Sequence, residues 1–407
     1  MERIVDQVLA QMVQAKASDL FLSTNNLPAV RVDGEIHFFG EENLTSQTTC
    51  RIFEELTGMD YQELFSTTSD MDIAYASTLG RFRVNIFRQH GVLGFVFRHI
   101  PSHIPSLEQL CLPTHILQKL GSLHRGLVLV TGITGSGKST TLAAVIQYIN
   151  QTMKRHIVTI EDPVEFVYER QYSLINQREI GRDSNNFAQA LRAAVRQSPD
   201  VILIGEMRDS ETVEAALQAA ETGHLVLSTL HTLNAIQTVE RILAFFPPHQ
   251  HALIRLQMAL VLEGVISQRL IKRSDGRGRV PAVEIMLGTP TVKELLEEGK
   301  TRLLDKAVAE GGHFGCQTFN QSLANLVKQN FVTMEDALKY SDNPDQLKMV
   351  FRGISQSNQT TIPGLGGMAS NSETERTDGI EKTRMMVQMP PRASTTQKPR
   401  PPSGRYM

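Results

Sequence analysis

The sequence has no tryptophan and only three cysteines, Cys50, Cys111 and Cys316, in 407 residues. The cysteines are odd in number, far apart, and none belongs to a Cys-x-x-Cys pair. This excludes a disulfide framework and a four-thiolate zinc site built by this chain alone. An excess of one charge is missing too, because 41 Lys+Arg and 43 Asp+Glu give a formal net charge of −2. This balance argues against a nucleic-acid coat protein or a polybasic membrane anchor.

Long apolar runs are also absent. No stretch approaches the roughly 18 uncharged apolar residues of a transmembrane helix, and the first 16 residues carry charges, unlike a secretory signal. Hydrophobic residues still make up 41% of the chain, which is enough to form cores. At roughly 100–200 residues per domain, the length predicts two or three domains. We therefore expect a reduced, cytoplasmic, multidomain protein.

The first hundred residues predict an α+β domain. Residues 2–16 place apolar side chains at helical spacing, and residues 18–23 have the pattern of a strand. Asp33-Gly34 separates two alternating runs, which is typical of a two-residue hairpin. The other elements expected here are a helix over 48–65 and strands over 71–76 and 80–99, the latter with a break at Gln89-His90-Gly91. Residues 101–122, which contain Pro101, Pro105 and Pro113, predict a structured linker.

From Gly126 the pattern changes to short apolar runs that alternate with helical patterns. Such alternation is typical of a parallel sheet with helices on both faces. We expect an α/β core over 123–290 and a helical C-terminal region over 291–353. The elements expected after Gly126 are strands in GLVLV, HIVTI, VILIG and HLVLSTL, helices from Lys138, near 186–197 and near 209–222, and mainly helical structure over 235–275 and 291–353.

Residues 354–407 are rich in Ser, Thr, Pro, Gly and Gln and have few aromatic residues. Such a segment cannot bury enough apolar surface to offset its ordering entropy. The composition predicts a disordered tail, which acts either as a passive extension or as a site for binding a partner.

A phosphate-binding motif follows the GLVLVT strand. Residues 132–139, here called the phosphate loop, satisfy G-x-x-x-x-G-K-[ST], and a helical pattern follows them. The glycines let backbone N–H groups approach phosphate oxygens, and the helix N-terminus favours an anion. Lys138 can reach the β- and γ-phosphates, and the Ser139 hydroxyl can ligate Mg²⁺. The residues expected to contact the nucleotide are Gly132, Thr134, Gly135, Ser136, Gly137, Lys138, Ser139 and Thr140.

Carboxylates follow two of the later strands. Glu206 ends the VILIG strand and is a candidate Mg²⁺ ligand, directly or through water. Glu161, Asp162 and Glu165 follow the HIVTI strand, at the strand end where open α/β sheets bind ligands. Close to a phosphate loop they are candidates for activating water. The alternative for this cluster is a charged, solvated turn.

Histidines and arginines complete the set of candidate residues. His224 and His231 bracket the LVLSTL strand. A histidine at a strand end can bond a phosphate or a carboxylate, and the alternative is two ordinary hydrogen-bonded histidines. Arginines on strands are usually solvated, and their alternative role is to stabilise a phosphate across a domain or subunit boundary. The arginines in question are Arg81, Arg83, Arg88 and Arg98.

Together these motifs resemble the secretion ATPases that drive type IV pili and type II secretion. The resemblance covers roughly residues 1–345 and keeps the family's motif order. Within this family the chain looks like the PilT/PilU retraction branch, since the other branches are longer at the N-terminus and typically carry a four-cysteine insertion. The motifs that carry it are GITGSGKSTT, TIEDPVEF, VILIGEMRD, TGHLVLSTLHT, GRFRVNIFRQ, NQREIG and QTFNQSL.

Two departures make the chain more similar to PilU-like than to PilT-like members. Phe21 stands in SDLFLS where the PilT pattern SDLHLS has histidine, and TVKELLEE follows GTP where PilT members have AIRNLIRE. The second motif is needed for retraction in PilT relatives, so the resemblance implies dependence on a partner. The long polar tail also fits the PilU-like branch.

The family resemblance implies a PAS-like α+β N-terminal domain over 1–100 and a RecA-like P-loop ATPase domain. It also implies roles for individual residues. Glu165 would be the general base, Glu206 would position Mg²⁺ and its water, and His231 would sense the γ-phosphate. Lys138 and Ser139 would bind phosphate and Mg²⁺. Arg83 and Arg98 would reach the phosphates, and Glu161 and Asp162 would support the site.

The expected protein is therefore a homohexameric ATPase of the pilus retraction machinery that uses ATP and Mg²⁺. It would be cytoplasmic, peripheral at the inner membrane, docked on a platform protein and accessory to a PilT-like ATPase. The alternatives are a primary PilT-like motor and an ATP-binding regulatory or scaffold subunit. A nucleic-acid motor is not supported, because no basic run with interleaved aromatic residues occurs.

Overall fold

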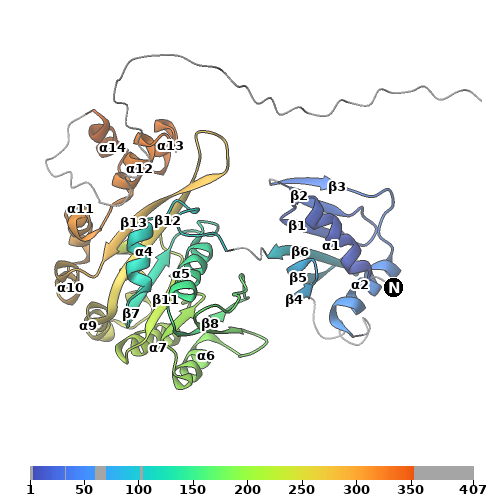
Figure 1. Cartoon of the computed structure of the whole chain (residues 1–407), viewed down its shortest axis with the longest axis horizontal. Helices are drawn as coiled ribbons and strands as arrows, with labels where there is room; N and C mark the ends of the chain where they lie inside the picture. The colour runs from blue at the N-terminus through green and yellow to red at the C-terminus, as the bar shows by residue number, and fades with distance from the viewer. Residues whose placement is uncertain (1–2, 33, 60–69, 101–103, 353–407) are drawn as a thin grey trace, which may run out of the picture. The chain divides into compact units, whose positions relative to one another are not determined.

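The computed structural model describes residues 3–32, 34–59, 70–100 and 104–352. The predicted tail over 354–407 lies outside these residues, as does the end of the helix expected over 48–65. The N-terminal elements are α1 (Ile4–Gln14), β1 (Asp19–Ser23), β2 (Ala29–Val32), β3 (Glu35–Phe38), α2 (Ser46–Thr57), β4 (Asp70–Ser77), β5 (Gly80–Gln89) and β6 (Val92–Ile100) (Figure 1).

The six N-terminal strands form one antiparallel sheet in the order β3-β2-β1-β6-β5-β4. Val32 pairs with Glu35, so β2 and β3 form the expected hairpin. Leu9 and Met12 of α1 lie in one buried cluster with Phe95 and Phe97 of β6. The predicted α+β arrangement of this part is therefore confirmed.

The rest of the described chain is built around a second, larger sheet (Figure 1). Its order is β13-β12-β7-β11-β10-β8-β9, with parallel pairs throughout except for the antiparallel pair β12–β13. The elements up to β13 are α4 (Thr114–Gly121), β7 (Gly126–Thr131), α5 (Lys138–Thr152), β8 (His156–Glu161), β9 (Leu174–Glu179), α6 (Phe187–Ala194), β10 (Val201–Ile204), α7 (Ser210–Glu221), β11 (Leu225–Leu230), α8 (Ala235–Ala244), α9 (His251–Val261), β12 (Leu262–Lys272) and β13 (Arg279–Leu287).

The four strands predicted from short apolar runs are β7, β8, β10 and β11. Nearly every residue in them is buried. Helices α5 and α7 both contact β7 and β11. Strands buried on both faces require helices on both faces, so the predicted α/β layering is confirmed.

The mainly helical structure expected over 235–275 is wrong in its second half. Helices α8 and α9 are present, but the chain then enters β12 directly at Leu262. Its apolar run, LEGVISQRLI, fits a buried strand as well as a helix, and pairing with β7 selects the strand. Strand β9, in the NQREIG segment, was not predicted, because it is a largely polar edge strand.

The predicted linker over 101–122 includes α4. Ile116, Leu117 and Leu120 of this helix belong to the same buried cluster as the central strands. This segment therefore contributes to the core of the larger sheet.

The C-terminal region is helical, as expected. The QTFNQSL motif connects it to the sheet: Gln317 pairs with Ile285 of β13 through the backbone, and Phe319 lies under Arg269 of β12, 3.8 Å from guanidinium carbon to ring centre. Asn320 donates to the carbonyl of Asn343. The helices of this region are α10 (Pro290–Glu297), α11 (Leu304–Glu310), α12 (Phe319–Lys328), α13 (Met334–Tyr340) and α14 (Pro344–Phe351).

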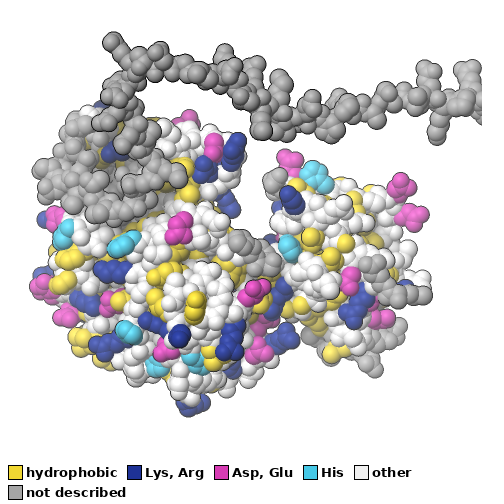
Figure 2. Space-filling view, in the orientation of Figure 1, with side chains coloured by type: hydrophobic (Ala, Val, Ile, Leu, Met, Phe, Trp, Pro, Cys, Tyr) yellow, Lys and Arg dark blue, Asp and Glu magenta, His cyan; other side chains and the backbone are white. Residues whose placement is uncertain are grey.

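Charges of both signs are interspersed on the face shown in Figure 2. Within the described ranges, no helix is long and apolar enough to cross a membrane.

Candidate active site

The phosphate loop lies between β7 and α5, as predicted. Gly132, Gly135 and Gly137 have positive φ values of 145°, 77° and 91°. A Cβ atom at Gly132 would lie 2.5 Å from the carbonyl oxygen of Gln268 and 2.5 Å from Ser136 Oγ, so no larger residue fits. Gly137 directly precedes α5, so the loop leads into a helix N-terminus that favours an anion.

Lys138 lies at the first position of α5. Its Nζ donates to the carbonyl oxygens of Gly132 and Ile133 at 2.9 and 3.2 Å. Burial lowers the pKa of the Lys138 ammonium, and the carboxylates of Glu206 and Glu165 oppose this shift. Both glutamates therefore lie close enough to the ammonium to act on it electrostatically.

Residues with hydroxyl groups flank Lys138 in the sequence. Ser136 Oγ is buried and has no hydrogen-bond partner within the described part of the chain. Thr134 and Ser139 are exposed, and Thr140 is half-buried. A buried hydroxyl without a partner is uncommon, and it fits a loop whose polar groups bind an anion.

Three carboxylates lie at the end of β8 and in the segment 162–168 that follows it, here called the acidic loop. Glu161 is buried and accepts hydrogen bonds from Thr159 Oγ1 at 2.6 Å and Gln177 Nε2 at 3.3 Å. Burial raises the pKa of the Glu161 carboxyl. Asp162 and Glu165 are both exposed. The burial of Glu161 makes it a structural carboxyl, whereas Glu165 is open to solvent.

Glu206 follows β10 and is held from two sides. Arg208 donates to one of its carboxylate oxygens, and His231 Nε2 lies 3.4 Å from the other. Burial raises the pKa of Glu206, but the hydrogen bonds and charges of Arg208 and His231 outweigh it, so the pKa is lowered overall. Glu206 is therefore a carboxylate at neutral pH. Arg208 also lies 3.5 Å from Asp162, which connects the two acidic segments.

The two histidines of the TGHLVLSTLHT motif have different surroundings. His231 follows the carboxyl end of β11, beside Glu206. His224 precedes β11, and its Nδ1 lies 2.8 Å from the carbonyl oxygen of Ala219, near the end of α7. Only His231 lies at the edge where β7, β8 and β10 also end. His224 therefore fits the alternative, an ordinary hydrogen-bonded histidine.

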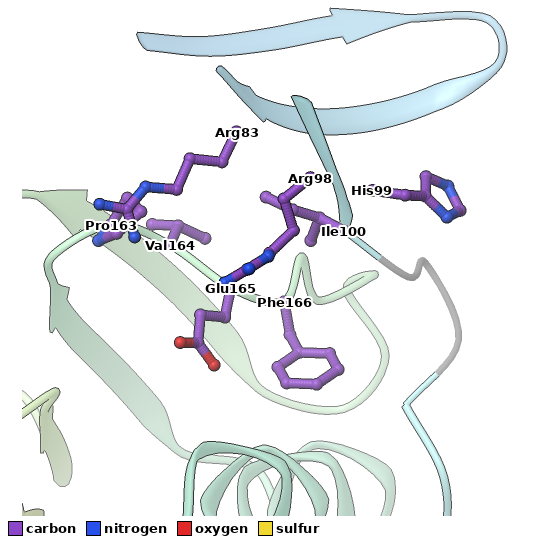
Figure 3. Close-up of a pocket in the computed structure, with 8 residues that line it drawn as sticks. All are labelled: Arg83, Arg98, His99, Ile100, Pro163, Val164, Glu165 and Phe166. Carbon is purple, nitrogen blue, oxygen red and sulfur yellow. The ribbon is translucent and has the colours of Figure 1, made fainter. Parts of the chain in front are cut away.

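The predicted arginines lie on β5 and β6. Arg98 Nε donates to Asp19 at 2.9 Å, and Arg83 lies 3.5 Å from Asp72. Arg83 and Arg98 line one pocket with Glu165 and Phe166 (Figure 3). Arg81 lies 3.4 Å from Glu179, and Arg88 is exposed at the end of β5.

The carboxyl ends of β7, β8, β10 and β11 thus bring together Lys138, Glu165, Glu206 and His231. Sequence reasoning missed Arg208, Gln177 and Glu179. Arg208 lies in the VILIGEMRD motif, two residues after Glu206, and this spacing was the available signal.

The sequence matches the family described as Type II/IV secretion system protein over residues 1–324. The chain belongs to this family.

Relatives place it within the PilT/PilU group of type IV pilus retraction ATPases. The type IV pilus retractation ATPase PilT of Pseudomonas aeruginosa is 42% identical over 345 residues, which are 84% of this chain and 99% of that protein. The type IV pilus ATPase PilU of the same organism is 37% identical over 361 residues, 88% of this chain and 94% of that protein. These identities do not separate the two branches, so the PilU-like assignment stays a prediction.

A solved structure of this group shares the fold. The crystal structure of the pilus retraction motor PilT with bound ADP has a TM-score of 0.79 and 41% sequence identity, and the match covers 86% of this chain and 99% of that one. The protein is thus a member of an ATPase family, with the α/β ATPase fold of PilT.

Proposed function

We propose that this protein hydrolyses ATP as a hexameric motor of type IV pilus retraction, accessory to a PilT-like ATPase. The main support for ATP hydrolysis is the arrangement around Lys138. Its ammonium lies at the start of α5 and within electrostatic reach of both Glu206 and Glu165. A phosphate-binding cation within electrostatic reach of two carboxylates suits the transfer of a phosphoryl group to water.

In this proposal Glu165 takes the proton of the attacking water. It is exposed and follows the carboxyl end of β8, whereas Glu161 is buried among hydrogen-bond donors. Lys138 and the backbone N–H groups of the phosphate loop stabilise charge on the phosphates. His231 contacts Glu206 and would report the state of the γ-phosphate to α8, which begins four residues later at Ala235.

The site also suits Mg²⁺. The Ser139 hydroxyl is exposed on the first turn of α5, and Glu206 is a carboxylate, so both offer the oxygen ligands that Mg²⁺ prefers. Among the described residues no group of three or more His, Cys, Asp and Glu side chains is arranged to hold a metal. This fits a cation that takes its other ligands from phosphate and water. Bound there, it would neutralise charge that develops on the phosphates.

Arg83 and Arg98 would supply further positive charge to the phosphates. Arg98 is bonded to Asp19, a side chain only 7% exposed, and Arg31 lies 3.5 Å from the same carboxylate. Arg98 can break its contact with Asp19, because Arg31 would still pair with this buried carboxylate. Arg83 has the longer contact, at 3.5 Å to an exposed Asp72.

The proposed assembly follows the family. Residues 1–100 would form a PAS-like domain, 101–122 a linker, 123–290 a RecA-like core, 291–353 a helical region and 354–407 a tail. Six copies would form a ring in the cytoplasm, peripheral to the inner membrane on a platform protein.

The accessory role rests on the segment after Gly288. Residues 291–298 read TVKELLEE and form most of α10, at the place where PilT members have AIRNLIRE. This segment lies outside the nucleotide site, so we expect hydrolysis without independent force transfer. The specific alternative is an ATP-binding scaffold, which would hydrolyse ATP slowly even as a purified hexamer.

The test expresses this protein in cells that lack the PilT-like partner and scores pilus retraction by fluorescence imaging. We expect no retraction there, but more frequent or stronger retraction when a catalytically impaired partner is present. Sustained retraction without a partner would make this chain the primary motor. No effect with the impaired partner would favour the scaffold.

A further inference from the structure

The acidic loop is held by side chains from β9, which lies at the end of the strand order, with three strands between it and the β7 strand that leads into the phosphate loop. Gln177 on β9 donates from Nε2 to the carbonyl oxygen of Phe166 at 2.7 Å, and its Oε1 accepts from the backbone N–H of Tyr168 at 3.2 Å. The second N–H of the same amide donates to Glu161 at 3.3 Å. The side-chain amide therefore uses both its donor and its acceptor ends on the acidic loop and the carboxyl beside it.

Glu179 holds the other side of the same loop. Its carboxylate accepts from the backbone N–H of Val164 at 3.3 Å and from Arg81 at 3.4 Å. Residues 177 and 179 point to the same side of β9, because side chains alternate along a strand. Together with Glu161, which accepts from the backbone N–H of Glu165, they fix backbone groups immediately before, at and after Glu165.

We propose that Gln177 and Glu179 are positioning residues that hold Glu165 in the geometry needed to activate water. The inference rests on the proposed role of Glu165 as general base. It assigns a function to the NQREIG segment, which none of the nucleotide contacts explains. Without these bonds the backbone groups on both sides of Glu165 would lose their partners, and the exposed Glu165 carboxylate would sample more positions.

A base displaced by about 1 Å can cost roughly 10²-fold in rate, even when the nucleotide still binds normally. Gln177→Met keeps the side-chain length and removes all three hydrogen bonds. We expect it to lower kcat about 10- to 100-fold while the affinity for Mg·ADP stays unchanged, since the phosphate loop is not altered. Asn176→Ala is the matched control, because Asn176 lies on the same strand but bonds His156 Nε2 at 3.0 Å instead of the acidic loop.

A pair of variants at Glu179 provides the second measurement. Glu179→Gln keeps an oxygen that accepts from Val164 N–H and removes the charge that faces Arg81. Glu179→Met removes both. We expect Glu179→Gln to retain most of the wild-type kcat and Glu179→Met to lose it to the same extent as Gln177→Met. If both variants lose activity equally, the contact with Arg81 matters and the positioning role is wrong.

The decisive comparison combines Gln177→Met with Glu165→Gln. If Gln177 acts through Glu165, the double variant hydrolyses ATP about as slowly as Glu165→Gln alone. If the fold losses in kcat of the two single variants multiply in the double variant, or if Gln177→Met has a normal kcat, the positioning role is wrong. The assignment of Glu165 as the base would then still stand. Normal hydrolysis by Glu165→Gln alone would instead overturn the base assignment, and this inference with it. Should Gln177→Met fail to fold, the Glu179 pair decides alone.

Discussion

The phosphate loop and the acidic loop both follow carboxyl ends of parallel strands, yet they are held in different ways. The phosphate loop is shaped by its own backbone, through glycines at positive φ and a lysine that bonds the loop's own carbonyl oxygens. The acidic loop is held by side chains of Glu161, Gln177 and Glu179. The first therefore carries its geometry in a short stretch of sequence, whereas the second depends on a strand that begins several residues after it.

The largest effect on ATP hydrolysis is expected from substitutions in the phosphate loop itself. Lys138→Ala removes the ammonium that lies on the loop, and we expect it to abolish hydrolysis and nucleotide binding. Gly132→Ala should match it, because the new Cβ would meet Gln268 O and Ser136 Oγ at 2.5 Å. Gly135→Ala separates backbone strain from steric clash, since a Cβ there meets nothing within 4 Å and its φ of 77° adds strain alone, so it should lose less activity than Gly132→Ala. Calorimetry measures the binding of ADP, and phosphate release measures hydrolysis. Normal turnover of Lys138→Ala would remove the phosphate-loop assignment.

The next effect separates binding from chemistry. Glu165→Gln keeps the size of the side chain and removes its basicity, so ATP binding should persist while turnover falls roughly 10²–10⁴-fold, the range for a lost general base. Asp162→Asn is the matched control on the same loop. If Glu165→Gln turns over ATP normally and Asp162→Asn does not, the base is Asp162.

The same contrast explains what the sequence revealed. The phosphate loop, β7, β8, β10 and β11 were predictable, because short buried apolar runs and a local glycine pattern define them. Strand β12 was not, since α9 runs into it at Leu262 without a break, and only pairing with β7 decides its structure. The roles of Gln177 and Glu179 were hidden too, because their partners on the acidic loop and Glu161 lie 9–16 residues away along the chain.

Thr131, which directly precedes the phosphate loop, is connected through Ser267 to one distant carboxyl group. Glu284 on β13 is buried, accepts from the backbone N–H of Ala235 at 2.7 Å, and pairs across the strands with Ser267. Ser267 in turn accepts from Thr131, the last residue of β7, at 3.0 Å. The pKa of Glu284 is raised to about 7: burial raises it most, hydrogen bonds from Ala235 and Ser267 lower it, and the charges of Asp305 and Asp342 raise it.

This raised pKa gives a prediction about stability. The folded state holds the proton more tightly than the unfolded chain, so the free energy of unfolding falls as pH rises from about 4.5 to about 7, by about 3 kcal/mol from this group. Glu284→Gln cannot ionise and should lack this component. Urea unfolding of both proteins between pH 5 and 8 should show a stability advantage of the variant that grows with pH. Parallel pH curves would contradict the assignment.

The smallest effect is expected beyond both loops, at the C-terminal tail. The last described helix, α14, ends at Phe351, and its Leu347 is fully buried with Phe319 and Leu323 of α12. Among the described residues, the apolar cluster of the helical region is built from side chains before residue 353, and the composition of 354–407 predicts no apolar face to extend it. Truncation after Gly353 should leave ATP hydrolysis and hexamer formation intact. The melting temperature should move by less than the roughly 2–4 °C that 1 kcal/mol produces in a protein of this size. A larger drop, or loss of the hexamer in size-exclusion chromatography, would show that the tail is structural. An intact hexamer that no longer supports retraction in cells would instead assign the tail to partner binding.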